Sequence, residues 1–393
     1  MNGKFLLKFL PITLLMLVGG SISAMAQEGV GSGLPQAIID DQRYNRAIHI
    51  MAMLLLGFGF LMVFVRKYGR SALTATFLLV SISLPVYLFL KSTGIMTEAA
   101  LEIDRLLFAE FAAASLLIAA GAVLGRLKMP QYLLLGLLFV PLYMLNEWVV
   151  LDGGLGLIPK GTVIDTGGSI VIHAFGAIFG LGVALTMTTK QELQKAIETD
   201  ATSDRYSMLG SMVLWIFWPS FCAALVTPEQ MPHTIVNVIL ALCGSTLVTY
   251  VMSLRLRKKV SIADIANAAL AGGVAIGSTC DSATHTTAMI IGILAGALST
   301  FGFAVIQSRQ QKWMKLIDTC GVTNLHGLPG LMGGVAALAV VKGINMSSQL
   351  LGIVITVVFA LIAGWIVGKI LPLFGRKEEA YDDAEEFLDA EEE

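Results

Sequence analysis

The chain has 393 residues, of which 56% are hydrophobic and 14% are charged, and its mean hydropathy is +0.78. Soluble domains carry roughly 25% charged residues, so this composition indicates an integral membrane protein. The formal net charge of −2 gives no reason to expect a nucleic-acid partner. The four cysteines show no paired spacing, so the sequence predicts neither a metal site nor a disulfide framework.

The N-terminal 26 residues have the pattern of a secretory signal peptide. Lys4 and Lys8 form a basic start, residues 6–18 are apolar, and Ala24-Met25-Ala26 fits a cleavage site with small flanking residues. We therefore predict a cleaved signal peptide over residues 1–26. The alternative is an uncleaved first helix, which leaves the later topology unchanged.

Apolar segments of about 20 residues predict about eleven membrane-spanning helices in an all-α protein. They lie near residues 45–65, 71–90, 106–125, 131–150, 168–188, 208–227, 234–254, 261–279, 286–307, 325–342 and 350–373. No connection is long enough for a soluble domain, so residues 27–377 are predicted to form one membrane domain. Residues 378–393 are strongly acidic, and we expect a solvated, disordered tail there.

Basic residues are distributed unevenly between the two sets of connections. One set, which includes the C-terminal stretch, carries 18 Lys and Arg residues, and the opposite set carries 6. Because basic residues accumulate on the cytoplasmic side of membrane proteins, this bias predicts an outer mature N-terminus and a cytoplasmic C-terminus.

An internal repeat occurs at an offset of 153 residues. Residues 165–185 and 318–338 share the pattern D-T-x-G-x4-H-x6-G-x3-A-L. The copies open the fifth and tenth predicted spans; these are five spans apart, an odd number, so the copies run in opposite directions. This arrangement predicts two inverted five-helix repeats, followed by a C-terminal helix, with the substrate path at the repeat interface.

The repeat places a histidine in each copy at the same depth. Eight helical residues, about 12 Å of rise, separate Asp165 from His173 and Asp318 from His326. Spans that enter from opposite faces therefore bring both histidines near the midplane, where ionisable groups usually face a pathway or a partner. Each aspartate has a simpler alternative role as a helix N-cap, and that role is compatible with holding a cation.

Several segments resemble the Rh branch of the Amt/Rh ammonium transporter family, and the chain is identified as a bacterial member. They are D-T-G-G-S-I-V-I-H-A-F-G from residue 165, D-T-C-G-V-T-N-L-H-G-L-P-G from residue 318, Ala109-Glu110-Phe111, Asn146-Glu147 and F-W-P-S-F from residue 217. The matching segments extend from the third predicted span to the tenth.

The resemblance implies roles for individual residues. His173 and His326 would be the twin histidines of the pore, and Phe111 and Phe221 two stacked phenylalanines that gate its outer mouth. Asp165 would support recruitment and deprotonation of ammonium, and Glu147 would lie in the outer vestibule. Asp318 is expected to be the structural aspartate related to Asp165 by the repeat.

The expected function is therefore ammonium or ammonia transport by a homotrimer with one pore per subunit, in a bacterial inner membrane. An enzyme activity, a cofactor and a metal are not expected. Neutral ammonia avoids most of the cost of moving a charge through an apolar pore, which favours deprotonation at the outer mouth. Alternatives are a pore for carbon dioxide or another small neutral gas, an ammonium sensor, and a membrane cytochrome with the histidines as haem ligands.

This chain departs from the family pattern in three places. Cys222 follows the second gate phenylalanine, where Rh proteins usually have asparagine, and the outer loop of residues 151–164 looks longer than usual. No counterpart is evident for the tryptophan that Amt-branch proteins use to hold ammonium outside. These departures concern affinity and transport mode more than the identity of the pore.

Overall fold

The computed structural model describes residues 34–94, 96 and 101–388. Within these residues all regular elements are helices, which confirms the predicted all-α class. Residues 41–388 form one compact unit, and residues 34–40, the first turns of a helix, are counted with the N-terminal unit. The predicted signal peptide, residues 1–26, lies outside the described residues.

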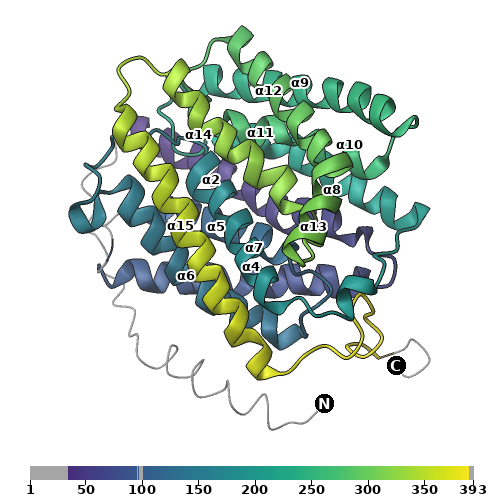
Figure 1. The fold of residues 1–393 in the computed structure, drawn as a ribbon. Coiled ribbons are helices and arrows are strands. Elements are labelled where there is room, and N and C mark those ends of the chain that lie inside the picture. The colour runs from purple at the N-terminus through teal and green to yellow at the C-terminus, as the bar shows by residue number, and fades with distance from the viewer. Residues whose placement is uncertain (1–33, 95, 97–100, 389–393) are drawn as a thin grey trace. The chain divides into compact units, whose positions relative to one another are not determined.

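The helices follow one another through short connections (Figure 1). In chain order they are α2 (Leu34–Ala52), η1 (Met53–Phe58), α3 (Gly59–Leu61), η2 (Met62–Phe64), α4 (Gly69–Ser92), α5 (Glu102–Gly121), α6 (Met129–Leu151), η3 (Gly154–Gly156), η4 (Ser169–Ala174), α7 (Phe175–Met187), η5 (Glu192–Gln194), α8 (Ala201–Cys222), α9 (Met231–Arg257), α10 (Ile262–Ala268), α11 (Ala271–Ile276), η6 (Gly277–Thr279), α12 (His285–Phe301), η7 (Gly302–Ile306), α13 (Gln307–Met314), η8 (Thr323–Gly327), α14 (Leu328–Val340), α15 (Met346–Ile370) and η9 (Leu371–Phe374).

Each predicted span coincides with a helix or with a run of consecutive helical turns. Eight of these runs, among the described residues, are long and apolar enough to cross a membrane. The runs that contain α5, α8 and α14 fall outside that set of eight. The structure therefore supports a multi-pass membrane protein.

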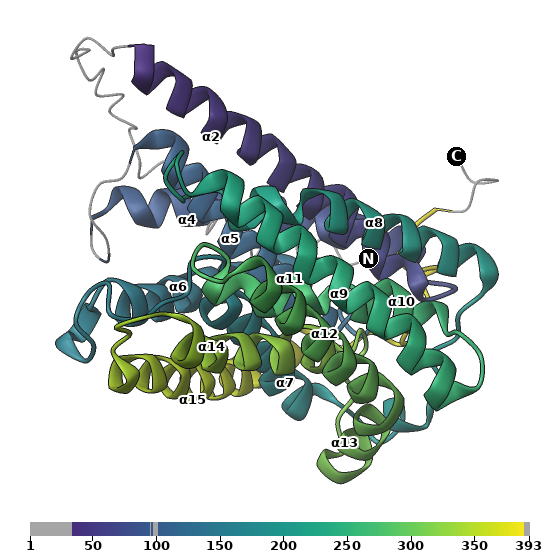
Figure 2. The ribbon, with the colours of Figure 1, turned by 90° about the horizontal axis from the view of Figure 1, so that it is seen from above.

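Helix α5 lies at the centre of the helices that position the site. Every residue from Ala109 to Gly121 is buried. Small residues allow neighbouring backbones to approach α5, as expected where lipid provides no hydrophobic drive between helices. On α7, a Cβ added to Gly180 would lie 2.7 Å from the carbonyl oxygen of Ala119. Seen from above, α9 lies beside α12 and α7 beside α15 (Figure 2).

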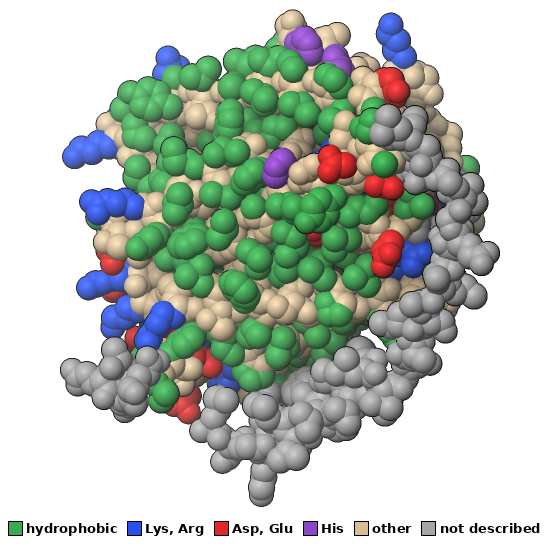
Figure 3. Space-filling model, turned by 180° about the vertical axis from the view of Figure 1, so that it is seen from behind, with side chains coloured by type: hydrophobic (Ala, Val, Ile, Leu, Met, Phe, Trp, Pro, Cys, Tyr) green, Lys and Arg blue, Asp and Glu red, His purple; other side chains and the backbone are tan. Residues whose placement is uncertain are grey.

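Apolar side chains cover much of the surface that Figure 3 shows, and most of the Lys and Arg side chains in this view gather along one edge. Individual helices expose large apolar residues, such as Ile216 at 61%, Leu247 at 62% and Val354 at 55%. Such surface is costly in water and suits contact with lipid or with another subunit.

The acidic tail differs from the solvated segment expected from its composition. Within residues 378–388, the backbone N–H of Tyr381 donates to the carbonyl oxygen of Gly125 at 2.9 Å. The carboxylate of Asp383 accepts from the guanidinium and the backbone N–H of Arg70, each at 3.1 Å. An acidic residue of the tail thus pairs with a basic residue of the membrane domain, and the composition of the tail alone does not reveal this contact.

We expect the backbone amides of Tyr381 and Asp383 to be protected from hydrogen exchange, because both donate to backbone carbonyl groups. Hydrogen-exchange mass spectrometry of the C-terminal peptide should show slow exchange in the intact protein. Asp383→Asn should increase the exchange rate, whereas Glu378→Gln serves as a charge-matched control. Complete exchange of both amides within seconds in the intact protein would contradict the docked tail.

Candidate functional site

The first copy of the repeated motif forms a tight turn at the start of η4. Both carboxylate oxygens of Asp165 accept from the N–H of Ile170, at 3.0 and 3.1 Å, and one also accepts from Val171 at 2.8 Å. The motif glycine, Gly168, has a φ of +74°. A non-glycine residue pays about 1–2 kcal/mol for that conformation, which explains the glycine.

The second copy repeats this turn at the start of η8. The carboxylate of Asp318 accepts from the N–H groups of Val322 and Thr323, both at 2.9 Å. Gly321, which occupies the position of Gly168, has a φ of +66°. The shared aspartate and glycine therefore build the same helix start twice.

The two turns allow a stability test with a matched control. Gly343 also has a positive φ, +73°, with nothing within 4 Å of an added Cβ, whereas a Cβ at Gly168 would meet Ile172 and one at Gly321 would meet Phe303. We expect Gly343→Ala to cost about 1–2 kcal/mol and the other two substitutions roughly twice as much. Thermal unfolding in detergent measures the difference. Equal shifts for all three variants would contradict the close packing of the turns.

The repeat-related histidines contact each other. His173 is 2% and His326 is 3% exposed, and their Nδ1 atoms lie 3.2 Å apart. The rings are almost parallel, at an interplanar angle of 10°. One Nδ1 must donate and the other accept, which leaves both Nε2 atoms for other partners. Among the described residues, His173 Nε2 has no hydrogen-bond partner.

A continuous row of rings passes through the histidine pair. Phe111 on α5 contacts Phe221 on α8 at a centroid distance of 4.8 Å. Phe221 lies 6.0 Å from His173, and His326 lies 6.3 Å from Phe58 in η1. The rings of the two phenylalanines, described as stacked in the resemblance, meet at 61° and pack edge to face.

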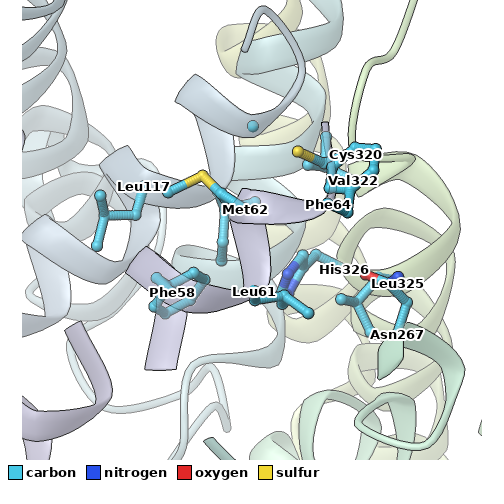
Figure 4. Close-up of a pocket in the computed structure, with 12 residues that line it drawn as sticks. Phe58, Leu61, Met62, Phe64, Leu117, Asn267, Cys320, Val322, Leu325 and His326 are labelled. Atoms are coloured by element: carbon cyan, nitrogen blue, oxygen red, sulfur yellow. The ribbon is translucent and has the colours of Figure 1, made fainter. Parts of the chain in front are cut away.

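A mostly apolar pocket lies at the His326 end of this row (Figure 4). Phe58, Leu61, Met62, Leu325 and His326 are among its lining residues. His326 is the member of the histidine pair that lines this pocket. The row and the pocket together surround the histidine pair with rings and aliphatic side chains.

Two further buried carboxyl groups, Glu147 and Asp165, accept hydrogen bonds from hydroxyl groups. Glu147 on α6 accepts from the hydroxyl groups of Tyr87 at 2.7 Å and Tyr143 at 3.4 Å. Asp165, in the loop before η4, also accepts from the hydroxyl group of Ser278 at 2.6 Å. Burial raises the pKa of Asp165 to about 6, although these hydrogen bonds oppose the shift.

Three residues that contact the site were not identified from the sequence. Trp218 stacks on His173 at a centroid distance of 5.5 Å. Trp218 precedes Phe221 by three residues in the F-W-P-S-F segment, a spacing that places both side chains on one face of a helix. This spacing could have identified Trp218 as a neighbour of Phe221 in the site. No sequence pattern identifies the other two residues. Tyr87 donates to Glu147 and Ser278 donates to Asp165, each from a helix that is distant in sequence.

No group of three or more His, Cys, Asp or Glu side chains suitable for a metal occurs among the described residues. The two histidines hydrogen-bond to each other through Nδ1, so a haem iron could not occupy the space between these atoms. The arrangement suits a neutral solute that exchanges hydrogen bonds with imidazole nitrogens.

Comparison with known proteins gives concordant matches. A family model described as the Ammonium Transporter Family matches residues 44–389. "Ammonium transporter Rh type A" of Bos taurus is 36% identical over 356 residues, which cover 86% of this chain and 81% of that protein. "Ammonium transporter Rh type B" of Mus musculus is 36% identical over 366 residues, which cover 84% of this chain and 79% of that protein.

Solved structures give the same result. The structure titled "Nitrosomonas europaea Rh50 and mechanism of conduction by Rhesus protein family of channels" is 55% identical, with a TM-score of 0.87, and the match covers 90% of this chain and 93% of that chain. The structure of a "Sensor Amt Protein" shares the fold. It is 17% identical, with a TM-score of 0.77, and the match covers 91% of this chain and 98% of that chain.

Proposed function

The chain belongs to the ammonium transporter family, and we propose that it transports ammonium by passing ammonia through the pore that contains His173 and His326. The single observation that carries this mechanism is the row of rings from Phe111 to Phe58, with the hydrogen-bonded histidines in the middle. Such a route offers few partners to an ion but offers imidazole nitrogens to a neutral molecule.

We propose that ammonium loses its proton at the end of the row near Phe111. Asp165 and Glu147 supply negative charge there, and removal of the proton avoids the large desolvation cost of moving a cation past the phenylalanine rings. Ammonia then passes the histidines, which can donate to it or accept from it at Nε2.

We propose a topology of eleven spans with the N-terminus outside and the C-terminus cytoplasmic, and the repeated motif supports two repeats of five spans within it. The excess of basic residues on one set of connections supports the same orientation. We also propose a homotrimer with one pore per subunit, in a bacterial inner membrane. Native mass spectrometry of the detergent-solubilised protein, expected to give three chains, tests the trimer.

The direct test uses proteoliposomes on a solid-supported membrane that receive an ammonium pulse. We expect a transient inward current, or, if transport is electroneutral, a faster rise of internal pH in stopped-flow measurements. A carbon dioxide gradient applied to the same vesicles tests the alternative gas pore. Faster acidification with carbon dioxide and no response to ammonium would contradict the proposal.

The pKa of Asp165 predicts how ammonium transport depends on external pH. Because this pKa is raised to about 6, the carboxylate is present above pH 6 and is lost as the pH falls through that value. At a constant ammonium concentration, transport should therefore fall between external pH 8 and 5, with a midpoint near 6. In Asp165→Asn the residual transport should lack this step, and an unchanged midpoint in that variant would assign the step to another group.

A further inference from the structure

Two histidines that the proposed mechanism does not use lie against each other at the starts of two neighbouring helices. His233 belongs to the first turn of α9, and His285 is the first residue of α12. Their ring centroids are 4.9 Å apart, with an interplanar angle of 35°. His285 is exposed and His233 is partly buried, so the pair is accessible from solvent. In the proposed topology both helices begin at the outer face.

The side chain of Asn237 fixes which nitrogen of His285 carries the proton. Its amide N–H groups donate to the backbone carbonyl oxygens of Cys280 at 2.9 Å and Ala283 at 2.7 Å. These bonds orient the amide so that its oxygen faces His285 Nδ1 at 2.8 Å. Because an amide oxygen only accepts, Nδ1 donates, and Nε2 of the neutral ring keeps its lone pair.

A carbonyl oxygen fixes the tautomer of His233. Its Nε2 lies 2.8 Å from the backbone carbonyl oxygen of Ala283, which only accepts, so Nε2 donates and Nδ1 of the neutral ring keeps its lone pair. The amide nitrogen of Asn237, 3.1 Å from the same Nε2, is then a contact between two donors. Each histidine thus donates one N–H to an oxygen and leaves its other nitrogen as an acceptor. Histidines that ligate metals are held in this way.

The geometry of the pair suits one shared ion. The N–H groups of both rings point to one anchor, the Asn237 amide and the Ala283 carbonyl group that it contacts. Because the two nitrogens of an imidazole lie on nearly opposite sides of the ring, both lone pairs face away from this anchor. With metal–nitrogen bonds of about 2.1 Å and ligand angles of about 90–110°, two imidazoles on one ion have centroids about 4.6–5.3 Å apart. The centroid distance of 4.9 Å falls within this range.

We propose that His233 Nδ1 and His285 Nε2 bind one divalent transition-metal ion, and that copper(II) binds most tightly. Imidazole suits copper, nickel and zinc, and the affinity of nitrogen ligands is highest for copper(II), whereas magnesium and calcium select oxygen ligands. No group of three metal-binding side chains occurs in the described part of the chain, so water completes the coordination. Each neutral imidazole contributes a lone pair, so no bond to hydrogen breaks and no oxidant or reductant is required.

The test uses the untagged full-length chain in detergent and copper(II) sulfate. Isothermal titration calorimetry should find one copper(II) ion per subunit, and electron paramagnetic resonance should show two nitrogen ligands. His233→Gln retains an N–H in place of Nε2, and His285→Asn retains one in place of Nδ1, so each variant keeps the structural hydrogen bond and loses the metal ligand. Each should bind copper(II) at least about tenfold more weakly. His49→Gln, at a partly buried histidine of α2, is the matched control and should bind as the intact protein does.

Thermal unfolding separates binding from folding. Because an ion that binds only the folded state stabilises it, copper(II) should raise the Tm of the intact protein and of His49→Gln by at least about 2 °C but leave the two site variants unchanged. His233→Ala and His285→Ala replace the amide variants if those do not fold. Equal copper(II) affinity in the intact protein and either site variant, or a spectrum with one nitrogen ligand, overturns the proposal. None of these measurements depends on ammonium transport.

Discussion

Replacement of both buried histidines, in His173→Ala/His326→Ala, is expected to reduce the ammonium response at least about tenfold. Ammonia that leaves water for the row of rings loses hydrogen bonds, and the histidines are the groups that can replace them. An unreplaced hydrogen bond costs about 1–3 kcal/mol, and each 1.4 kcal/mol corresponds to a factor of about ten. Currents on a solid-supported membrane and stopped-flow pH traces measure the loss.

The single variants His173→Ala and His326→Ala test whether the two histidines act jointly or independently. If the two imidazoles act through their shared hydrogen bond, each single variant should lose nearly as much as the double variant. The pair would be excluded from the pathway if the double variant, folded and correctly inserted, retained the full ammonium response.

Asp165→Asn is expected to lower ammonium transport at least about tenfold, and Asp165→Ala should also destabilise the protein. The carboxylate accepts hydrogen bonds from Ile170, Val171 and Ser278 in a buried position. Hydrogen bonds to charged groups contribute about 1.5–3 kcal/mol each, so loss of this set should cost about 3 kcal/mol or more. Thermal unfolding and transport are measured on the same preparation.

Asp318→Asn is the matched control, because Asp318 holds the corresponding turn in the second copy of the motif. We expect a similar loss of stability but a smaller loss of ammonium recruitment, since the proposed recruitment of ammonium involves Asp165 and not Asp318. Equal losses of transport in the two variants would mean that the aspartates act only as structural caps.

The sequence by itself determined the helical membrane architecture and the repeated motif. Long apolar segments reveal spans because lipid requires every backbone polar group to be satisfied within the helix. The motif identified the two aspartates, and the structure shows why the glycine recurs, since Gly168 and Gly321 both adopt a positive φ. The equal spacing from each aspartate predicted that His173 and His326 would reach the same depth.

Only the tertiary structure decided which side chains complete the site. Ser278 donates to Asp165 from 113 positions away in the sequence, and Tyr87 donates to Glu147 from 60 positions away. No local pattern encodes such contacts, because they depend on how helices distant in sequence pack. The acidic tail shows the same limit: its composition predicts a solvated segment, but Arg70 lies where it can pair with Asp383.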